Sequence, residues 1–535
     1  MPKKEKISDM VTVAKAPKIV EARRPTGYVQ KYELRKWTYN MPMEVIPSSK
    51  IKASFTADII VVGAGTSGKA AALTAAQNGA KVIQLDRHTT FRYSGGHIAA
   101  IGTRVQNKAG VKVDVDEICL ALMRQSGNYP DQRFYRMWAE HSGPTLDWVT
   151  DMLDPEGIAT NLYQYPRPSW YDIRKEYYPD YPVTLFHSAP WSSGLDHSLS
   201  LGTLQKHAIK AGVEIKYQTR AMQVVRQQNG RVTAVIAMNK NGEYEQYNAT
   251  KAVIMCTGDY GNNPWMMQKY CPEGVEIALE NNIYMTRNED LRTAPEPLDT
   301  GDGLQMVMRI GGVMGTGPHA PMAHATAGPL GNAAFLRVNI EGERYENEDV
   351  SAQSIANSFN HQPYKKAWQI FDSKWEDEIT RGGIGLGRFY TITPMVRTNF
   401  ETLSIKANTL EELAEKMGVP VKAFTATVAR YNKMAEKGHD DDYGKYPLRL
   451  TTISKPPYYA GATKQEFLVV LGGLNTNVKL QPLDADRKPI PGLYLAGNMV
   501  GNRFAIEYPV MCAGLSHGLA YVTGRLAGKY AAGEM

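Results

Sequence analysis

The sequence predicts an α/β protein in which a second, α+β domain is inserted into the first. Three observations predict this. The chain has 535 residues, which is too many for one ordinary domain of about 100–200 residues. Residues 58–86 alternate short apolar runs with an Ala-rich helical segment, as in a buried parallel sheet. Residues 320–460 lack that alternation and instead predict a turn, a strand and two helices.

The segment 58–86 predicts a strand, a glycine turn, a helix, a second strand and a carboxylate, in that order. The first glycine permits a sharp bend, the second lets the backbone approach a pyrophosphate, and the third lets helix and strand pack closely. The N–H groups at the helix start then face the phosphates. Asp86, 23 positions after Gly63, can accept hydrogen bonds from ribose hydroxyls. The sequence therefore predicts a Rossmann-like dinucleotide-binding turn formed by Gly63, Gly65, Thr66, Ser67 and Gly68.

Later segments extend both domains. The Asn-Gly turn at residues 228–230 precedes an alternating run and predicts a hairpin. In the first domain, assigned to residues 55–318 and 461–535, we expect helices at 203–212, 300–308 and 516–532 and strands at 213–217, 231–238, 251–258 and 488–498. In the second, assigned to residues 319–460, we expect a turn and strand at 342–348, helices at 409–417 and 422–437, and a return linker at 438–458.

The net charge of +7 lies in the N-terminal segment. Residues 1–54 contain 12 Lys and Arg and 5 Asp and Glu, whereas the rest of the chain contains 49 of each sign. The folded body is thus expected to be neutral, which gives no reason to expect nucleic-acid binding. We interpret residues 1–54 as a basic, partly ordered arm, with docking to a partner or membrane surface as the alternative.

The composition is that of a globular protein, with 43% hydrophobic and 21% charged residues. No run approaches the ~18 apolar residues of a membrane span, and the N-terminus lacks the apolar core of a secretory signal. The four cysteines are far apart, without a C-x-x-C pair, which argues against a disulfide framework, a metal site and an internal haem or iron–sulfur relay. We therefore expect a cytoplasmic protein without a transmembrane segment.

Taken together, the motifs resemble those of the FAD-binding flavoproteins that include soluble fumarate reductases, urocanate reductases and 3-ketosteroid dehydrogenases. Besides the glycine turn, the resemblance rests on the strand end at Thr257-Gly258, the helix start at 300–303, the Asn347-Glu348 pair and the segment 491–497, which ends in Ala-Gly. It covers residues 55–535. The resemblance implies a two-part FAD-binding domain of the GR2 type, with the inserted domain capping the flavin ring.

The resemblance also implies which residues hold FAD. Asp86 stands where the family has an acid on the adenosine ribose, and Asn498 where it contacts the ribityl chain or the flavin. The helix start at Leu515 and Ser516 would face the flavin, where a helix dipole stabilises the reduced form. His97 lies near a position of covalent attachment in some relatives, but the family's following Thr is absent, so noncovalent FAD is expected. The other residues expected at the cofactor are Arg87, Gly95, Gly96, Met222, Thr257, Gly258 and Asp302.

Three differences from fumarate reductases argue against a dicarboxylate substrate. Those enzymes have a proton-donating Arg at the position of Ala352, a His pair at Leu468 and Val469, and a carboxylate-binding Arg at Tyr508. A dianion buried without these partners would be very unstable. The ketosteroid branch fits better, because its Tyr-Pro pair follows the Asn498 position at the spacing found here.

The ketosteroid branch implies that the Tyr508 hydroxyl, with a backbone N–H near Cys512, binds a 3-oxo group while hydride passes between flavin N5 and the β-carbon. That branch has a proton-moving Tyr where this chain has Ala352. We therefore expect reduction of the C=C bond of a 3-oxo steroid or bile-acid-like enone, with its formation as the second choice. The expected partners are a small apolar carbonyl substrate and an unidentified external electron donor or acceptor.

Several candidate residues keep two interpretations. His319 or His324 could donate a proton or be loop structure, and Gln353 is expected on the surface. Arg503 could anchor a substrate carboxylate or, as we rather expect, pair with Glu507. An aromatic cluster could wall a flat ligand or pack on itself; it consists of Tyr163, Tyr165, Trp170, Tyr171, Tyr177, Tyr178 and Tyr181.

Two rival functions follow. The first is a reductase of an unsaturated aryl carboxylic acid, similar to urocanate reductase, with Arg503 as the carboxylate anchor. The second is a flavin-bound electron-transfer subunit that uses residues 1–54 for docking. No second G-x-G-x-x-G motif is present, so a dedicated NAD(P)H domain is not expected.

Overall fold

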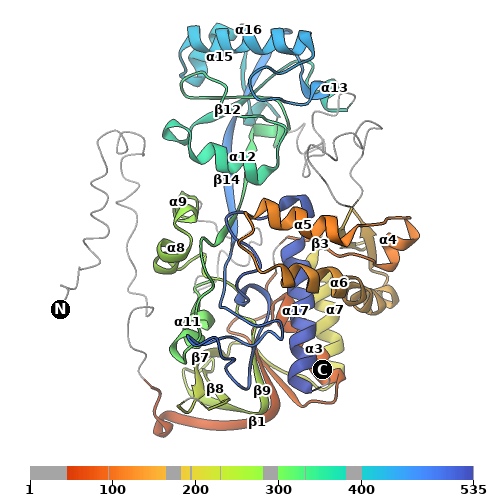
Figure 1. The fold of residues 1–535 in the computed structure, drawn as a ribbon, viewed down its shortest axis with the longest axis vertical. Helices are drawn as coiled ribbons and strands as arrows, with labels where there is room; N and C mark the ends of the chain where they lie inside the picture. Colours follow the sequence, from red (N-terminus) through yellow and green to blue (C-terminus); the bar gives the residue numbers. More distant parts are fainter. Residues whose placement is uncertain are drawn as a thin grey trace, which may run out of the picture. The chain divides into compact units, whose positions relative to one another are not determined.

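The computed structural model describes residues 45–533 except 94, 164–181, 193–195, 229, 281–298, 332 and 381–399. The described residues form two compact units, shown in Figure 1. Residues 323–466 form one, here called the inserted unit, and residues 45–322 with 467–533 form the other, here called the FAD unit. Both contain helices and strands, so the α/β class is confirmed.

A seven-stranded sheet forms the centre of the FAD unit. Six of its strands follow the order β6-β2-β1-β9-β8-β7, and the seventh, β15, pairs with β9. Their bounds are β1 Ile51–Val62, β2 Val82–Leu85, β6 Glu214–Lys216, β7 Arg220–Arg226, β8 Val232–Met238, β9 Tyr244–Met255 and β15 Leu493–Leu495. Strands β6, β2, β1, β9 and β15 run parallel, whereas β7 and β8 form the expected antiparallel hairpin.

Strand β1 shows why this region forms a central strand. Its last four residues, 59–62, are all apolar and buried, as in a strand with both faces covered. The strand begins at Ile51, inside the segment that the sequence assigned to the arm. Residues 51–57 pair with β9 from Tyr244 onward, and that pairing extends the strand beyond its apolar part.

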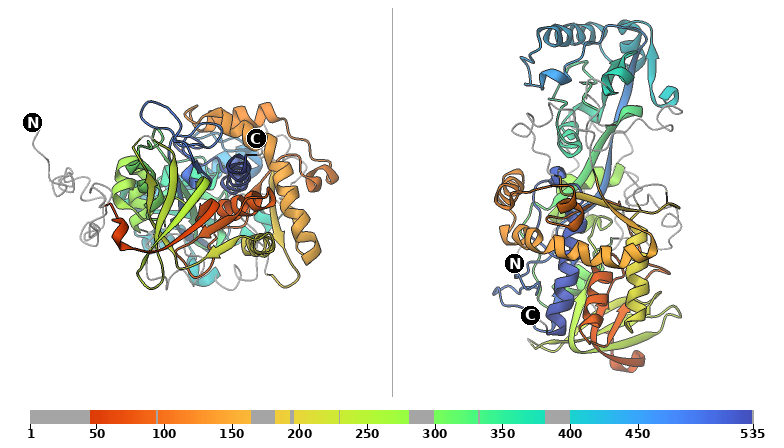
Figure 2. Two further views of the ribbon diagram at one scale, coloured as in Figure 1. Left: turned by 90° about the horizontal axis from the view of Figure 1, so that it is seen from below. Right: turned by 90° about the vertical axis from the view of Figure 1, so that its right-hand side faces the viewer.

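Helices α3 (Thr66–Gln77), α7 (His197–Lys210) and α17 (Leu515–Ala532) lie side by side in the FAD unit (Figures 1 and 2). The sequence predicted all three within a few residues of their ends. The unit also contains α4 Arg104–Lys108, α5 Val115–Gln125, α6 Gln132–Leu153, α8 Pro264–Tyr270, α9 Pro272–Glu280 and α11 Asp302–Arg309. A small sheet of order β3-β5-β4 completes it, with β3 at Ile98–Ala99, β4 at Ala159–Leu162 and β5 at Thr184–Ser188.

The inserted unit has its own sheet, of order β10-β14-β12-β11 with β13 on β14. The strands are β10 Ala320–Ala327, β11 Leu336–Asn339, β12 Ala367–Asp372, β13 Ile405–Ala407 and β14 Tyr458–Leu471, and the helices are α12 Ala352–Asn360, α13 Trp375–Thr380, α15 Leu410–Met417 and α16 Val421–Lys437. Leu413, Phe424 and Val428 pack against Ile370 in its core. Helices α15 and α16 confirm the two helices expected here.

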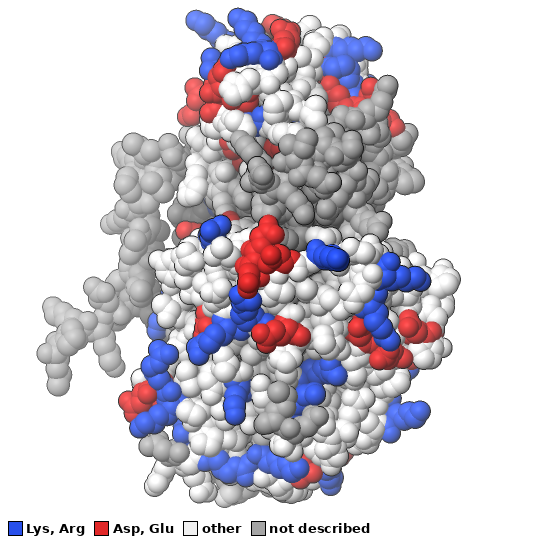
Figure 3. All heavy atoms as spheres, turned by 45° about the vertical axis from the view of Figure 1, so that its right-hand side comes forward, with Lys and Arg blue, Asp and Glu red and all other residues white. Residues whose placement is uncertain are grey.

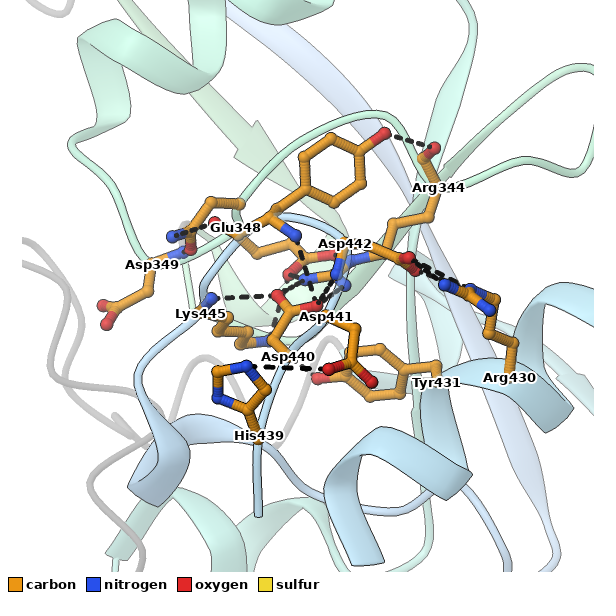
Figure 4. A network of polar contacts seen from close by, with 12 residues as sticks. Arg344, Glu348, Asp349, Arg430, Tyr431, His439, Asp440, Asp441, Asp442 and Lys445 are labelled. Carbon is orange, nitrogen blue, oxygen red and sulfur yellow. Dashed lines mark hydrogen bonds and ion pairs between the residues drawn. The ribbon is translucent and has the colours of Figure 1, made fainter. Parts of the chain in front are cut away.

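One expectation for the inserted unit was wrong. Residues 342–348 form a turn and one isolated bridge between Arg344 and Val338, not a strand. The segment 438–458 leads from α16 to β14 as expected, but Asp440 and Lys445 within it are buried. Both segments are held by charge pairing rather than by a strand pattern (Figure 4).

The pairing is dense and internal to the inserted unit. Arg344 donates to Glu348 and to Asp440 at 2.8 Å each, and Lys445 Nζ lies 3.2 Å from Glu348 Oε2. Burial alone would raise the pKa of Glu348, but the charges of Lys445 and Arg344 hold it below its usual value. The buried charges thus neutralise one another.

The surface and the helices agree with the composition. On the face in Figure 3, exposed Lys and Arg side chains lie among Asp and Glu side chains over the described residues. None of the helices in the described ranges is long and apolar enough to cross a bilayer.

Candidate functional site

Four loops of the FAD unit meet at one edge of its sheet. They follow the carboxyl ends of β1, β2, β9 and β15, which are parallel neighbours. This edge is where open α/β sheets bind ligands. Most residues that the sequence assigned to a cofactor lie on these four loops or on α17.

The glycine turn after β1 has the geometry that the motif predicts. Gly63 has φ of +106°, and a Cβ there would lie 2.3 Å from the Cys256 carbonyl oxygen. A Cβ on Gly68 would lie 2.0 Å from the Gly63 carbonyl oxygen. At Gly65, by contrast, the nearest atom to an added Cβ is 3.9 Å away. The turn is therefore closed toward the protein and open at Gly65.

Helix α3 begins directly at this open face, with Thr66 and Ser67 in its first turn. Its N-cap is Gly65, and no described side chain caps it. The first N–H groups of the helix are thus available to an anion. Beside the turn, the buried Nε of Arg92 has no hydrogen-bond partner. This cradle and its donors fit a dinucleotide pyrophosphate.

Asp86 joins the glycine turn to the end of β2. Its Oδ2 accepts the N–H of Ala64 at 2.7 Å, and its Oδ1 accepts the N–H of His88 at 2.8 Å. Burial raises the pKa of Asp86, although both backbone hydrogen bonds oppose that shift. The carboxylate therefore also fixes the turn, a role that the sequence did not predict.

A polar group links three segments near Asp86. Arg87 Nη1 lies 3.3 Å from Thr300 Oγ1 and 3.5 Å from Asp302 Oδ2. Arg220 Nη2, from β7, also donates to Asp302 at 2.8 Å. Met222 is half-buried on the same strand. The structure thus brings together Arg87, Asp302 and strand β7.

Two acids that the sequence did not indicate lie close to the end of β9: Asp259, which is buried on the following loop, and Asp299, which is half-buried just before α11. Thr257 Oγ1 donates to Met499 Sδ at 2.9 Å, and Gly258 lies beside Asp299. Burial and the charge of Asp299 raise the pKa of Asp259 well above its usual value, and burial raises the pKa of Asp299 to about 6. The position of Asp259, directly after the Thr-Gly strand end, was the signal that could have indicated it.

The loop after β15 packs on the glycine turn. A Cβ on Gly497 would lie 2.5 Å from Ser67 Oγ. The Asn498 amide donates to Asp259 Oδ2 at 3.4 Å and accepts from Arg503 Nη2 at 3.2 Å. Asn498 therefore connects Asp259, on the loop after β9, to Arg503, farther along its own loop.

Tyr508 lies at the N-terminus of α17. Its hydroxyl accepts the N–H of Ser516 at 3.1 Å, and its side chain is 1% exposed. The sequence expected this N–H to face the flavin; in the structure the Ser516 N–H is bonded to Tyr508 instead. The surrounding side chains in the FAD unit are apolar or phenolic and include Tyr135, Leu471 and Phe504.

His97 and His517 meet beside the same helix start. His517 Nδ1 donates to the His97 carbonyl oxygen at 2.8 Å, and an added Cβ on Gly95 would lie 3.2 Å from His517 Cε1. Gly96 is buried next to them. The His97 ring meets Tyr163 edge-on at 4.9 Å. The other six members of the aromatic cluster, residues 165–181, lie outside the described residues.

Arg503 does not form the expected ion pair with Glu507. Its Nε donates to the Val500 carbonyl oxygen at 2.8 Å, and its Nη1 is buried without a partner. Glu507 accepts instead from Gln125 at 2.9 Å. The reason is local, because residues 503–507 are not helical, so a spacing of four does not bring the side chains together.

His319 has both ring nitrogens engaged. Nδ1 lies 2.5 Å from the Tyr260 hydroxyl and Nε2 lies 3.0 Å from the Gly315 carbonyl oxygen, so the proton sits on Nε2. Burial lowers the pKa of His319. This geometry does not support direct proton donation to a substrate. Gln353 is not on the surface either: it is 1% exposed, and its Oε1 accepts the N–H of Ala323.

In the ranges that the structure describes, no group of three or more His, Cys, Asp or Glu side chains could hold a metal ion. The four cysteines, all within the described residues, are buried and are not joined in disulfides. The chemistry of this edge therefore rests on the glycine cradle, the helix N-termini, and the buried Arg, Asp and Tyr side chains.

Comparison with known proteins agrees with this geometry. A model of the family described as FAD binding domain matches residues 58–513. The chain is 29% identical over 503 residues to a vinyl phenol reductase of Lactiplantibacillus plantarum, covering 89% of this chain and 96% of that protein. It is 28% identical to a probable fumarate reductase, Ifc3, of Shewanella frigidimarina (90% and 75% covered) and 24% identical to a 3-oxosteroid 1-dehydrogenase of Mycolicibacterium smegmatis (84% and 93%).

Among solved structures, the fold is similar to that of a 3-ketosteroid-Δ4-(5α)-dehydrogenase from Rhodococcus jostii RHA1. The TM-score is 0.69 at 23% identity, and the match covers 92% of this chain and 99% of the other. The resemblance drawn from the sequence is thus confirmed, and so are the flavoprotein fold and FAD as the cofactor.

Proposed function

Because the chain belongs to the FAD binding domain family, we propose that it reduces a C=C bond conjugated to a ketone in a flat apolar molecule, such as a 3-oxo steroid or a bile-acid-like enone. The general activity, that of an FAD-dependent oxidoreductase acting on C=C bonds, follows from the family and its relatives. When bound, FAD supplies hydride chemistry at flavin N5. The reduction adds a hydride and a proton across the double bond, and its two electrons come from an external donor.

The observation that carries the proposal is the Tyr508 hydroxyl at the start of α17. Because this hydroxyl accepts the Ser516 N–H at a helix N-terminus, its own O–H becomes a stronger hydrogen-bond donor. A donor of this kind stabilises the negative charge that forms on a carbonyl oxygen as hydride reaches the β-carbon. The apolar neighbours Leu471 and Phe504 suit a substrate with little other polarity.

Reduction is proposed rather than desaturation because of Ala352. Desaturation needs a base for the α-proton, and an alanine cannot act as one. In the reductive direction the α-carbon takes up a proton, which water can deliver. We further propose that FAD is held without a covalent bond to His97; acid precipitation should then release all the yellow colour into the supernatant.

A second candidate is a reductase of an unsaturated aryl compound with an anionic oxygen, such as an aryl carboxylic acid. Two observations favour it. Arg503 has a buried Nη1 without a partner, and the relative at 29% identity is named for a vinyl phenol. The fumarate reductase relatives do not extend the proposal to dicarboxylates, because Ala352 and Tyr508 replace the arginines expected for such a substrate.

The test is anaerobic reoxidation of the dithionite-reduced holoenzyme, followed by flavin absorbance. The oxidants are a 3-oxo-Δ4 steroid, 4-vinylphenol, urocanate and fumarate. The proposal expects fast reoxidation by the steroid and none by fumarate or urocanate. Reoxidation by urocanate or vinylphenol alone would overturn it. In that case Arg503→Ala should abolish reoxidation by the acid.

A further inference from the structure

Arg503 is a buried cation that forms no ion pair with a described residue. Its side chain is 1% exposed, and two of its three nitrogens donate to neutral acceptors, the Val500 carbonyl and the Asn498 amide. Nη1 has no hydrogen-bond partner among the described residues. Burial lowers the pKa of Arg503 to about 10, and the groups that interact with it electrostatically are two phenols, Tyr135 and Tyr508. A guanidinium held this way is costly unless a ligand supplies negative charge.

Asp259, the acid that Arg503 reaches through Asn498, does not contact the guanidinium directly. Asn498 stands between Arg503 and Asp259, with its oxygen toward the guanidinium and its nitrogen toward the carboxyl. Asp259 is 3% exposed, and its Oδ1 accepts the Gly261 N–H at 2.9 Å. A carboxyl this deeply buried beside Asp299 favours its neutral form, so Asp259 does not neutralise the charge of Arg503.

The cluster lies where FAD is held. Gly497, next to Asn498, packs against Ser67 of the glycine turn, and its N–H donates to Thr523 Oγ1 of α17 at 3.0 Å. The loop that carries Asn498 and Arg503 is thus fixed between α3 and α17. The hydrogen bond to Asn498 ties the guanidinium to this loop, and Arg503 is shielded from solvent.

We propose that Arg503, positioned by Asn498 and Asp259, sets the reduction potential of bound FAD. FAD gains negative charge on reduction, so a nearby buried cation stabilises the reduced form more than the oxidised form. The residue acts on the cofactor before any substrate binds. The inference therefore goes beyond the proposed function and does not depend on which C=C bond is reduced.

The test is the midpoint potential of FAD in the substrate-free holoenzyme, measured by anaerobic spectroelectrochemistry, together with the affinity for sulfite. Sulfite binds oxidised flavins as an anionic adduct and so reports positive charge at the ring. Arg503→Met should shift the reduction equilibrium at least tenfold toward oxidised FAD, about 30 mV for a two-electron couple. It should also weaken sulfite binding at least tenfold. Arg503→Lys, which keeps the charge, should restore most of both values.

The matched control is Arg525→Met. Arg525 lies on α17 in the same unit, and it donates to the Pro144 carbonyl oxygen at 2.9 Å and lies over Trp148. Removal of this charge should leave both readouts unchanged. Equal shifts in the two variants, or wild-type values in Arg503→Met, would overturn the proposal.

A second variant, Asn498→Asp, tests the proposal in case Arg503→Met does not retain FAD. Asn498→Asp keeps the size of the side chain and places a carboxylate 3.2 Å from Arg503 Nη2, at the position of the present amide oxygen. The neutralised guanidinium should then lower the potential and the sulfite affinity in the same direction. A potential equal to that of the wild type in this variant would also contradict the role of Arg503. Neither measurement involves substrate, so failure here is distinct from failure of the proposed function.

Discussion

Two buried charged clusters, one in each unit, differ in how their charges are paired. In the inserted unit, Arg344 lies between Glu348 and Asp440 at 2.8 Å from each (Figure 4). In the FAD unit, Arg503 pairs with no described carboxylate, and Asp259 has a raised pKa. Buried charges that pair with one another hold a fold together, whereas unpaired ones mark a place that a ligand completes. The contrast separates a structural network from a candidate site.

Arg344→Met should have the largest effect on stability. It leaves Glu348 and Asp440 buried without their cation, which typically costs about 3–5 kcal/mol. The measurement is urea unfolding followed by the fluorescence of Trp368 and Trp375 in the inserted unit. The midpoint potential of FAD should not move. A loss of stability near zero would show that the network is not structural.

Gly68→Ala should remove FAD. Its Cβ would lie 2.0 Å from the Gly63 carbonyl oxygen, so the turn must deform. Gly202→Ala on α7 is the control, because the nearest atom there is 4.0 Å away. That variant should keep FAD and gain up to about 1 kcal/mol from helix propensity. The flavin-to-protein absorbance ratio measures the difference, and a yellow Gly68→Ala protein would contradict the assigned turn.

These glycines show what the sequence could predict. Their roles depend on residues adjacent in the chain and on strand and helix patterns of short period, so the turn, α3, the β7–β8 hairpin and α17 were predicted correctly. The charge network could not be predicted, because Arg344 and Asp440 are 96 residues apart and the segment around Asp440 has the composition of a loop.

The candidate site shows the same limit. Asn498 and Tyr508 came from a motif, but their partners Asp259 and Ser516 come from other loops and elements. Tyr135, in the middle of α6, gives no signal in the sequence at all. The expected Arg503–Glu507 pair was wrong, because Asn502 and Ile506 have positive φ angles and the irregular backbone does not bring the two side chains together.

Acid should weaken the inserted unit through protonation of Asp440. Burial would raise the pKa of Asp440, but hydrogen bonds from Arg344 and from the Lys445 N–H lower it below the usual 3.8. The stability that Asp440 contributes is therefore complete above about pH 4 and is lost as the pH falls further. Urea unfolding between pH 3 and 6 should show this slope, and Asp440→Asn should flatten it. An unchanged slope in that variant would assign the acid sensitivity to other groups.

Lys437→Met should have the smallest effect. Lys437 Nζ lies 2.8 Å from Asp441 Oδ1, but both side chains are largely exposed. Exposed pairs contribute little, because water screens them. Urea unfolding of this variant should match the wild type. A loss comparable to that of Arg344→Met would remove the distinction between buried and exposed pairing in this unit.

The most direct test of the account is single-turnover reoxidation of the reduced holoenzyme by a 3-oxo-Δ4 steroid, in the wild type and in Tyr508→Phe. The variant removes only the hydroxyl that accepts the Ser516 N–H. The account predicts fast reoxidation of the wild type and a rate lower by about 100-fold or more in the variant, with FAD content and flavin spectrum unchanged. Equal rates in the two proteins, or a wild type that only unsaturated acids reoxidise, would contradict it.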